Sequence, residues 1–293
     1  MPSREISVAV TEPFDFDLTL QFLEGFSPTK GEIAIDAGSL EKTWLRDGVP
    51  ITAKVRRAEG GLACALSSPR RIDEDAARAM AERVSFFLGA RDDVSAFYAI
   101  AARDDAFAPV AARLRGLHHA KFPTPFEAAC WALLNQRVGL PRAREMKSAL
   151  VARFGAAGAF PEAATLARAT ESAIRACVGV DRKARAVWSA AQAFAKVDEK
   201  WLQTAPIGEV DAWVRRIWGA GDFTAAFVLF RGLGRALPPP AGLPWSPAFV
   251  LAAKKTYGPK ATRASLAKRA APYGEWLGYW SLYLWASTFV HPR

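Results

Sequence analysis

The hydrophobic pattern of the chain changes its period near residue 70. Before that point, Gly and Asp turns separate short segments of alternating or β-branched composition, which is typical of antiparallel strands. These segments are 6–10, 31–35, 51–56 and 61–66. A cluster of Phe and Leu at 16–23 predicts one short helix within the same unit. The first part of the chain is therefore expected to be a small sheet domain.

From residue 73 onward the apolar residues recur with helical spacing. Phe126, Ala129, Cys130, Leu133 and Leu134 form a core-facing stripe of this kind. The final helix is apolar nearly all round, which predicts burial. Expected helices cover 73–88, 92–103, 106–114, 126–136, 141–154, 162–168, 171–178, 182–195 and 275–287. Together the two parts predict the α+β class, with an N-terminal antiparallel sheet domain followed by two all-helical subdomains around a cleft.

Two amphipathic helical runs, at 210–217 and 223–230, are joined by a short turn that contains Gly219 and Gly221. So short a connection predicts a helical hairpin. Glycine permits positive φ and allows close approach of a partner to the backbone. The amides at the start of the second helix would then be free to bind an anion such as phosphate.

The charge of the chain supports a polyanionic partner. Lys and Arg number 39 against 29 Asp and Glu, a formal net charge of +10. The segment 223–274 contains no acidic residue. Its basic residues are Arg231, Arg235, Lys254, Lys255, Lys260, Arg263, Lys268 and Arg269. We expect this segment to form a surface that faces negative charge.

Other chemistry is not indicated by the sequence. The three cysteines are far apart, which favours reduced thiols and no metal pattern. His118 and His119 lack a ligand pattern around them, so we expect surface or phosphate-contacting roles rather than a metal site. No apolar leader or membrane-spanning run is present, and we expect a cytoplasmic protein without a membrane partner.

The order of several segments resembles that of the AlkA-like alkylpurine DNA glycosylases (DNA-3-methyladenine glycosylase II) of the helix-hairpin-helix (HhH-GPD) superfamily. The similar segments are 126–155, 179–186, 214–225 and 276–285. The β-rich start of the chain also matches the N-terminal sheet domain of that family. The resemblance therefore spans nearly the whole chain.

The resemblance implies a division into three parts. Residues 1–88 would form the sheet domain, 119–235 the helical subdomain that carries the hairpin, and 89–118 with 236–293 the other helical subdomain. It also implies a monomer that binds damaged double-stranded DNA and flips a base out for excision. No cofactor is implied, although carbonyls of a hairpin turn can hold a monovalent cation.

Residue roles follow by position within the similar segments. Gly219, Ala220 and Gly221 would form the phosphate-binding turn, with Thr224 at the start of the second hairpin helix. Arg137, beside Gln136, falls where the family places the side chain that wedges into the duplex. An alternative for Arg137 is an exposed arginine at a helix end with no special role.

Aromatic side chains near the expected cleft could stack on a flipped, positively charged base. The candidates are Trp218, Trp245, Tyr273 and Trp276. Trp245 lies in a proline-rich segment, 237–247, which is expected to be a stiff loop that closes over the pocket or plugs it.

The family's catalytic aspartate has no counterpart. Its position falls at or near Ser246, and the nearest acids in sequence are Asp222 and Glu275. Asp222 is better explained as a helix cap than as a relocated catalyst, and Glu275 would have to reach the cleft from the final helix. Without a carboxylate, the cationic character that develops on the sugar loses an electrostatic partner.

Three functions therefore stay open. The chain either excises bases that already leave easily, such as alkylated purines, or it is a catalytically inactive relative that binds lesions without cutting. The third alternative, a helical scaffold for proteins, leaves the acid-free basic segment unexplained.

Overall fold

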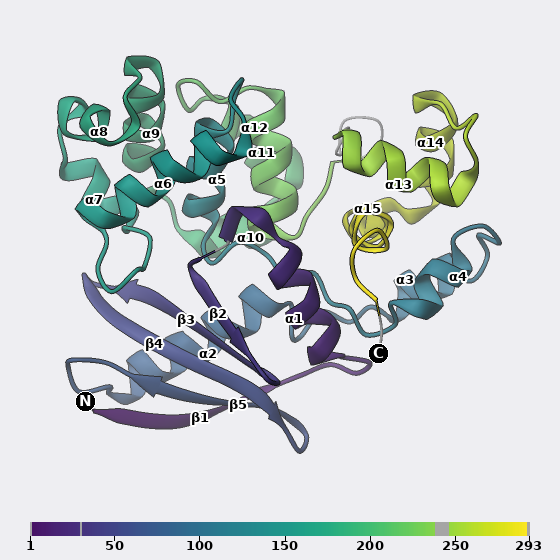
Figure 1. Ribbon diagram of the computed structural model, residues 1–293, viewed down its shortest axis with the longest axis horizontal. Helices are drawn as coiled ribbons and strands as arrows, with labels where there is room; N and C mark the ends of the chain where they lie inside the picture. The colour runs from purple at the N-terminus through teal and green to yellow at the C-terminus, as the bar shows by residue number, and fades with distance from the viewer. Residues whose placement is uncertain (1, 30, 238–245, 292–293) are drawn as a thin grey trace.

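The computed structural model describes residues 2–29, 31–237 and 246–291. Five antiparallel strands form one sheet in the order β1-β5-β4-β3-β2. The strands are β1 (Ser3–Ala9), β2 (Ile33–Asp36), β3 (Ser39–Arg46), β4 (Val49–Ala58) and β5 (Gly61–Ser67). The sheet lies at one end of the molecule, and most helices lie on the other side (Figure 1). The expected α+β class, with an N-terminal sheet followed by helices, is confirmed.

Strand β3 was not predicted from the sequence, because one of its buried, inward-facing residues is a lysine. Its segment contains Glu41-Lys42-Thr43, which reads as polar, yet Lys42 is 2% exposed. The neighbouring Leu40 and Trp44 point to the same side and are also buried. The strand thus follows period-two alternation once Lys42 is counted as an inward residue.

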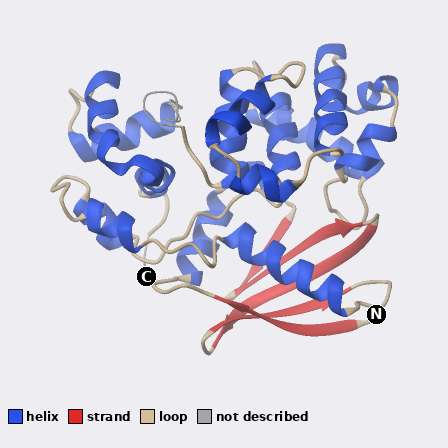
Figure 2. Cartoon of the chain, turned by 180° about the vertical axis from the view of Figure 1, so that it is seen from behind, coloured by secondary structure: helices blue, strands red, loops and turns tan. Residues whose placement is uncertain are grey.

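Two helices cover the sheet. Helix α1 (Phe16–Gly25) begins where Asp15 accepts a hydrogen bond from the amide of Leu18, at 2.9 Å. Helix α2 (Glu74–Leu88) lies across a face of the sheet and contacts β1 (Figure 2). It ends at Gly89, which adopts φ 64°.

The remaining helices form two groups. The first group contains α5 (Pro125–Leu134), α6 (Leu140–Phe154), α7 (Ala163–Arg168), α8 (Glu171–Val178), α9 (Asp181–Phe194), α10 (Glu199–Thr204), α11 (Ile207–Arg215), α12 (Asp222–Phe227) and the π-helix η2 (Val228–Gly232). The second contains α3 (Ser95–Ala101), α4 (Ala108–Arg113), α13 (Pro247–Tyr257), α14 (Arg263–Ala270), η3 (Ala271–Trp276) and α15 (Leu277–Ala286). A short 3₁₀ turn, η1 (Ser27–Thr29), follows α1.

Two hydrophobic cores correspond to this arrangement. One joins the sheet, α1 and α2 to the second helical group, and its aromatic centre includes Phe97, Tyr273 and Trp280. The other lies inside the first helical group. The three-part division of the chain stays a prediction. Helix α15 is buried along almost its whole length, as its apolar composition predicts.

A buried charge cluster joins the sheet domain to α5 and α6. Lys147 Nζ donates to Glu127 Oε1 at 2.6 Å, to Glu32 at 2.8 Å and to the carbonyl of Pro28 at 3.1 Å. Burial opposes the charged ammonium, but the two carboxylates outweigh it and raise the pKa of Lys147. The cluster holds α5 in place, and the functional site lies at the far end of that helix.

Among the described residues, no helix is long and apolar enough to cross a membrane.

Candidate functional site

Three turns that are far apart in sequence meet on one surface. They are the α5–α6 turn, the α8–α9 turn at Gly179, and the hairpin turn between α11 and α12. Gln136 Nε2 of the first turn donates to Gly219 O and to Thr224 Oγ1 of the hairpin, each at 3.0 Å. These contacts place two of the four segments that carry the family resemblance side by side.

Lys183 fastens the α8–α9 turn to the end of α5. Its Nζ donates to three backbone carbonyls, those of Leu134 at 2.7 Å, Gln136 at 2.9 Å and Leu133 at 3.2 Å. Burial lowers the pKa of Lys183. The ammonium satisfies C-terminal carbonyls that α5 itself leaves free.

Gly219 is required by the fold. Its φ is 84°, which L side chains rarely adopt, and a Cβ there would lie 2.9 Å from Ala186 Cβ of α9. The hairpin turn can therefore approach α9 only with glycine at this position.

Gly221 is not required by the fold. Its φ of −114° and ψ of −166° suit any residue, and a Cβ there would meet no described atom within 4 Å. Gly221 is exposed and is the N-cap of α12. The fold therefore does not explain why this position is a glycine.

The start of α12 presents free amide donors. Among the described residues, no acceptor bonds the amides of Gly221, Asp222 or Phe223. All three residues are exposed. The amides and the open glycine together form a surface suited to an anion.

Asp222 does not have the capping role expected from the sequence. It is the first residue of α12, with Gly221 as the cap, and its side chain makes an ion pair with Arg215. Its carboxylate is 95% exposed. A negative charge at this end of a helix is favourable for the helix dipole, and the arginine offsets its repulsion of a phosphate.

Two exposed aromatic rings flank the turn. Trp218 is 37% exposed, and the Arg185 guanidinium lies 4.6 Å from the centre of its ring. Phe223, on the first turn of α12, is 51% exposed and packs against Phe227. From the sequence, Phe223 is expected only as one residue of an apolar helical stripe. Its position directly after the glycine turn, two residues beyond Gly221, was the signal that could have identified it.

Arg137 is exposed beside this surface and has φ 55°. A non-glycine residue in this region is strained by roughly 1 kcal/mol or more. The bend directs the chain from the end of α5 into α6.

Ser246, Glu275 and Trp276 belong to the second helical group. Ser246 is exposed and caps α13, where its hydroxyl accepts from the Phe249 amide at 3.2 Å. Glu275 is exposed in η3, and Trp276 is half-buried against Tyr279. Trp245 and most of the proline-rich loop lie outside the described residues.

Tyr273 does not fit the stacking role expected for it. Its ring is 1% exposed and packs against Phe107 and Trp280, while its hydroxyl donates to Asp104 Oδ2 at 3.4 Å. The sequence places Tyr273 near the last helix but does not show that its side chain points into the core.

The two histidines are also buried, contrary to the expectation of surface positions. His118 contacts the carbonyls of Gly89 and Pro13, at 2.6 and 2.9 Å. His119 Nε2 lies 2.9 Å from Arg231 Nη1. Burial, together with the charges of Arg231 and Lys121, holds the pKa of His119 well below its ordinary value.

Arg231 lies on the π-helix η2 in an aromatic cage. Its guanidinium faces the rings of Phe22, Phe26, Phe230 and Trp285 at 4.4 to 5.8 Å. Burial lowers its pKa to about 9. The contacts join α1, η2 and α15, so the residue connects the hairpin helix to both other parts of the molecule.

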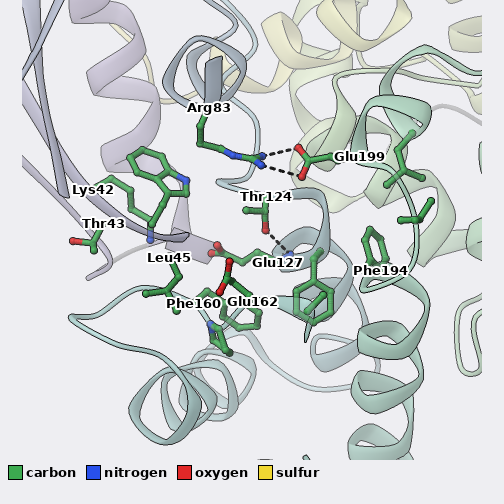
Figure 3. A pocket seen from close by; sticks show the side chains of 16 residues that line it. Lys42, Thr43, Leu45, Arg83, Thr124, Glu127, Phe160, Glu162, Phe194 and Glu199 are labelled. Carbon is green, nitrogen blue, oxygen red and sulfur yellow. Dashed lines mark hydrogen bonds and ion pairs between the residues drawn. The ribbon is translucent and has the colours of Figure 1, made fainter. Parts of the chain in front are cut away.

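A separate hollow of about 220 Å³ lies between the sheet and the first helical group (Figure 3). Arg83 and Glu199 face each other there through hydrogen bonds of 2.6 and 3.0 Å. None of the residues predicted from the sequence as site residues lines this hollow. It belongs to the junction of sheet and helices rather than to the hairpin surface.

Within the parts of the chain that the structure describes, no group of three or more His, Cys, Asp or Glu side chains is arranged to hold a metal ion. At the hairpin, the Gly219 carbonyl is already used by the Gln136 amide.

Comparison with known proteins matches residues 130–224 to the HhH-GPD superfamily of base excision DNA repair proteins. This region runs from α5 through all three turns to Thr224. This part of the chain is therefore similar to the HhH-GPD superfamily. The matched region coincides with the surface built by Gln136, Lys183 and the glycine turn.

The chain is also similar to individual proteins. A DNA-3-methyladenine glycosylase of Bacillus subtilis (strain 168) is 25% identical over 207 residues, which cover 66% of this chain and 67% of the relative. The fold is similar to that of a 3-methyladenine DNA-glycosylase from Archaeoglobus fulgidus, with TM-score 0.75, 18% identity and coverage of 96% and 97%. It is also similar to the 8-oxoguanine glycosylase/lyase of Clostridium acetobutylicum, with TM-score 0.65, 13% identity and 98% coverage of both chains.

Proposed function

We propose that this protein is a DNA glycosylase that flips alkylated bases out of double-stranded DNA and releases them by hydrolysis of the N-glycosidic bond. The observation that carries the proposal is the exposed start of α12. Its amides lack protein acceptors among the described residues, and Gly221 is a glycine that the fold does not need. A DNA phosphate is the partner that both features suit. The proposal places the protein with DNA in the cytoplasm, as a monomer without a cofactor.

The hairpin would fix the DNA backbone beside the aromatic rings. Phe223 and Trp218 present exposed faces on either side of the turn. Stacking on an aromatic side chain stabilises an unpaired base by about 1–3 kcal/mol, and a ring face favours a cationic base further. Arg137 would occupy the space that the flipped base leaves in the duplex, because a planar guanidinium can stack on neighbouring bases.

Alkylated purines suit a site without a strong acid or base. Such a base carries a positive charge and leaves as a neutral molecule, so its departure needs no proton from the protein. Ser246, at the position expected for the family's aspartate, offers a hydroxyl lone pair to the developing charge on the sugar but no negative charge. Removal of water and binding of the extruded base would supply the rest of the acceleration.

The relationship to the Bacillus subtilis DNA-3-methyladenine glycosylase supports the same substrate class. The test is incubation of the purified protein with methylated duplex DNA, followed by chromatography of the released bases. We expect release of methylated purines above the rate without protein. Tight DNA binding with no release would overturn the catalytic part of the proposal and identify a relative that binds lesions without cutting.

A further inference from the structure

The second helical group carries a basic surface that the hairpin does not explain. We propose that α13, α14 and the turn between them form a second contact for the backbone of duplex DNA, separate from the glycine turn. This inference rests on the proposed DNA-binding function and extends it to another part of the molecule.

The basic side chains of this surface are exposed. Lys254 and Lys255 are on α13, Lys260 is in the turn, and Lys268 is on α14. Within the described parts of the chain, none of these four lysines makes an ion pair or a side-chain hydrogen bond. The buried residues Phe249, Ala252, Ala253, Leu266 and Ala270 are on the opposite sides of the two helices.

The helix dipole explains only part of this distribution. Both helices have basic residues in the last turn, where they complement the dipole. Helices α2, α8 and α10 also have acids in the first turn, whereas α3, α4, α6 and α7 have none. The first turns of α13 and α14 have no acid, and neutral Ser246 and Thr262 cap them. Negative charge is therefore absent where the helix alone would favour it.

A hollow of about 580 Å³ beside α14 continues the basic surface. Arg103, Lys268 and Arg269 line it, and Asp104 is the single acid in its lining. Asp104 is occupied by the hydroxyls of Tyr257 and Tyr273, and its other oxygen lies 4.0 Å from Arg269. The hollow thus keeps an excess of positive charge that suits a phosphate.

The hairpin and the basic surface lie at the same end of the molecule. Helices α13 and α14 and the hairpin helices α11 and α12 are all at the end away from the sheet in both views (Figures 1 and 2). Under this proposal, a duplex bound at the hairpin extends along this end of the molecule to α13 and α14.

The test compares two triple variants in DNA binding as a function of salt. The first, Lys254→Gln with Lys255→Gln and Lys268→Gln, removes three charges from the proposed surface. The matched control, Lys54→Gln with Arg56→Gln and Arg71→Gln, removes three exposed charges from the sheet domain. Thermal unfolding of both checks that each remains folded.

We expect the first variant to bind a duplex at least tenfold more weakly at low salt than the control. The slope of log affinity against log salt should fall by about 2–3, because each lost phosphate contact changes it by ~0.9. Equal slopes and affinities for the two variants, with wild-type DNA binding intact, would overturn this inference and leave the proposed function standing.

Two other results separate the remaining explanations. If the wild-type protein shows no salt-dependent DNA binding at all, the proposed function itself fails. If the first variant keeps the DNA slope but loses binding to poly-glutamate, the surface serves an acidic protein, and the inference is wrong.

Discussion

Gln136 and Gly219 are 83 positions apart in sequence and are joined by one hydrogen bond of 3.0 Å from a side-chain amide to a backbone carbonyl. The same amide nitrogen also bonds the buried hydroxyl of Thr224. The end of α5 therefore sets the position of both helices of the hairpin. The Gln136 side chain thus joins the glycine turn of the hairpin to the end of α5, which belongs to the core of the first helical group.

Replacing Gln136 with alanine should loosen the hairpin. Two acceptors would lose their donor, so we expect the free energy of unfolding to fall by about 1–2 kcal/mol. DNA affinity should fall several-fold, because the amides of α12 are no longer held in place. Denaturant unfolding and fluorescence binding would measure the two effects. Gln203→Ala, which removes a longer 3.3 Å contact on half-exposed α10, is the control and should change neither quantity appreciably.

The two hairpin glycines should respond differently to alanine. Gly219→Ala should destabilise the fold by about 1–2 kcal/mol from backbone strain alone, before the contact with Ala186 is counted. At Gly221, alanine is a poorer N-cap but restricts the unfolded chain, two opposing effects of about 1 kcal/mol each, so stability should change by less than about 1 kcal/mol. DNA affinity should fall tenfold or more, since a Cβ would stand where the phosphate approaches. A Gly221→Ala protein with wild-type affinity would exclude this turn as the phosphate site.

Gly208→Ala is the matched control for both variants. Gly208 is exposed on α11, has no positive φ, and a Cβ at this position would meet no described atom within 4 Å. Alanine there should stabilise the helix by up to about 1 kcal/mol and leave DNA affinity unchanged.

Ser246→Asp should increase base excision. Aspartate caps a helix as well as serine does, so α13 should keep its start while the site gains a carboxylate. An electrostatic group of this kind contributes about 2.7–4 kcal/mol to catalysis, and we expect single-turnover release of methylated purines to rise by up to ~1000-fold. Ser246→Asn keeps the cap without the charge and should not gain activity. If both variants behave like the wild type, the carboxylate position lies elsewhere.

Acid should destabilise the protein through His119. Burial and the adjacent Arg231 hold the pKa of His119 well below its ordinary value, so the folded protein keeps the ring neutral. The unfolded chain takes up a proton below about pH 6.5. Stability is therefore complete above that pH and falls by ~1.4 kcal/mol per unit of pH below it, until the folded pKa is reached. In His119→Asn this contribution should disappear, and chemical denaturation at pH 5.5 and 7.5 would measure the difference; equal pH dependence in both proteins would contradict the assignment.

The sequence predicts the fold class and the hairpin well because both depend on local periodicity and glycine spacing. It does not predict which way isolated side chains point. Tyr273 is expected near the cleft and His118 and His119 at the surface or in contact with phosphate, yet all three are buried in the core. Lys42 is a further case, since a lysine in a short polar run gives no sign of an inward-facing strand position. The sequence also does not show whether Ser246 occupies the position of the family's catalytic aspartate. The helix start that this serine caps is defined only in three dimensions.

The left-handed backbone of Arg137 has a consequence for engineering the protein. Glycine would occupy that bend without the strain, so Arg137→Gly is expected to make the molecule more heat-resistant while deleting the side chain proposed to enter the duplex. Thermostability and repair would then change in opposite directions at one position. Selection for thermal stability alone would therefore favour a protein that still binds DNA but lacks the side chain proposed to enter the duplex.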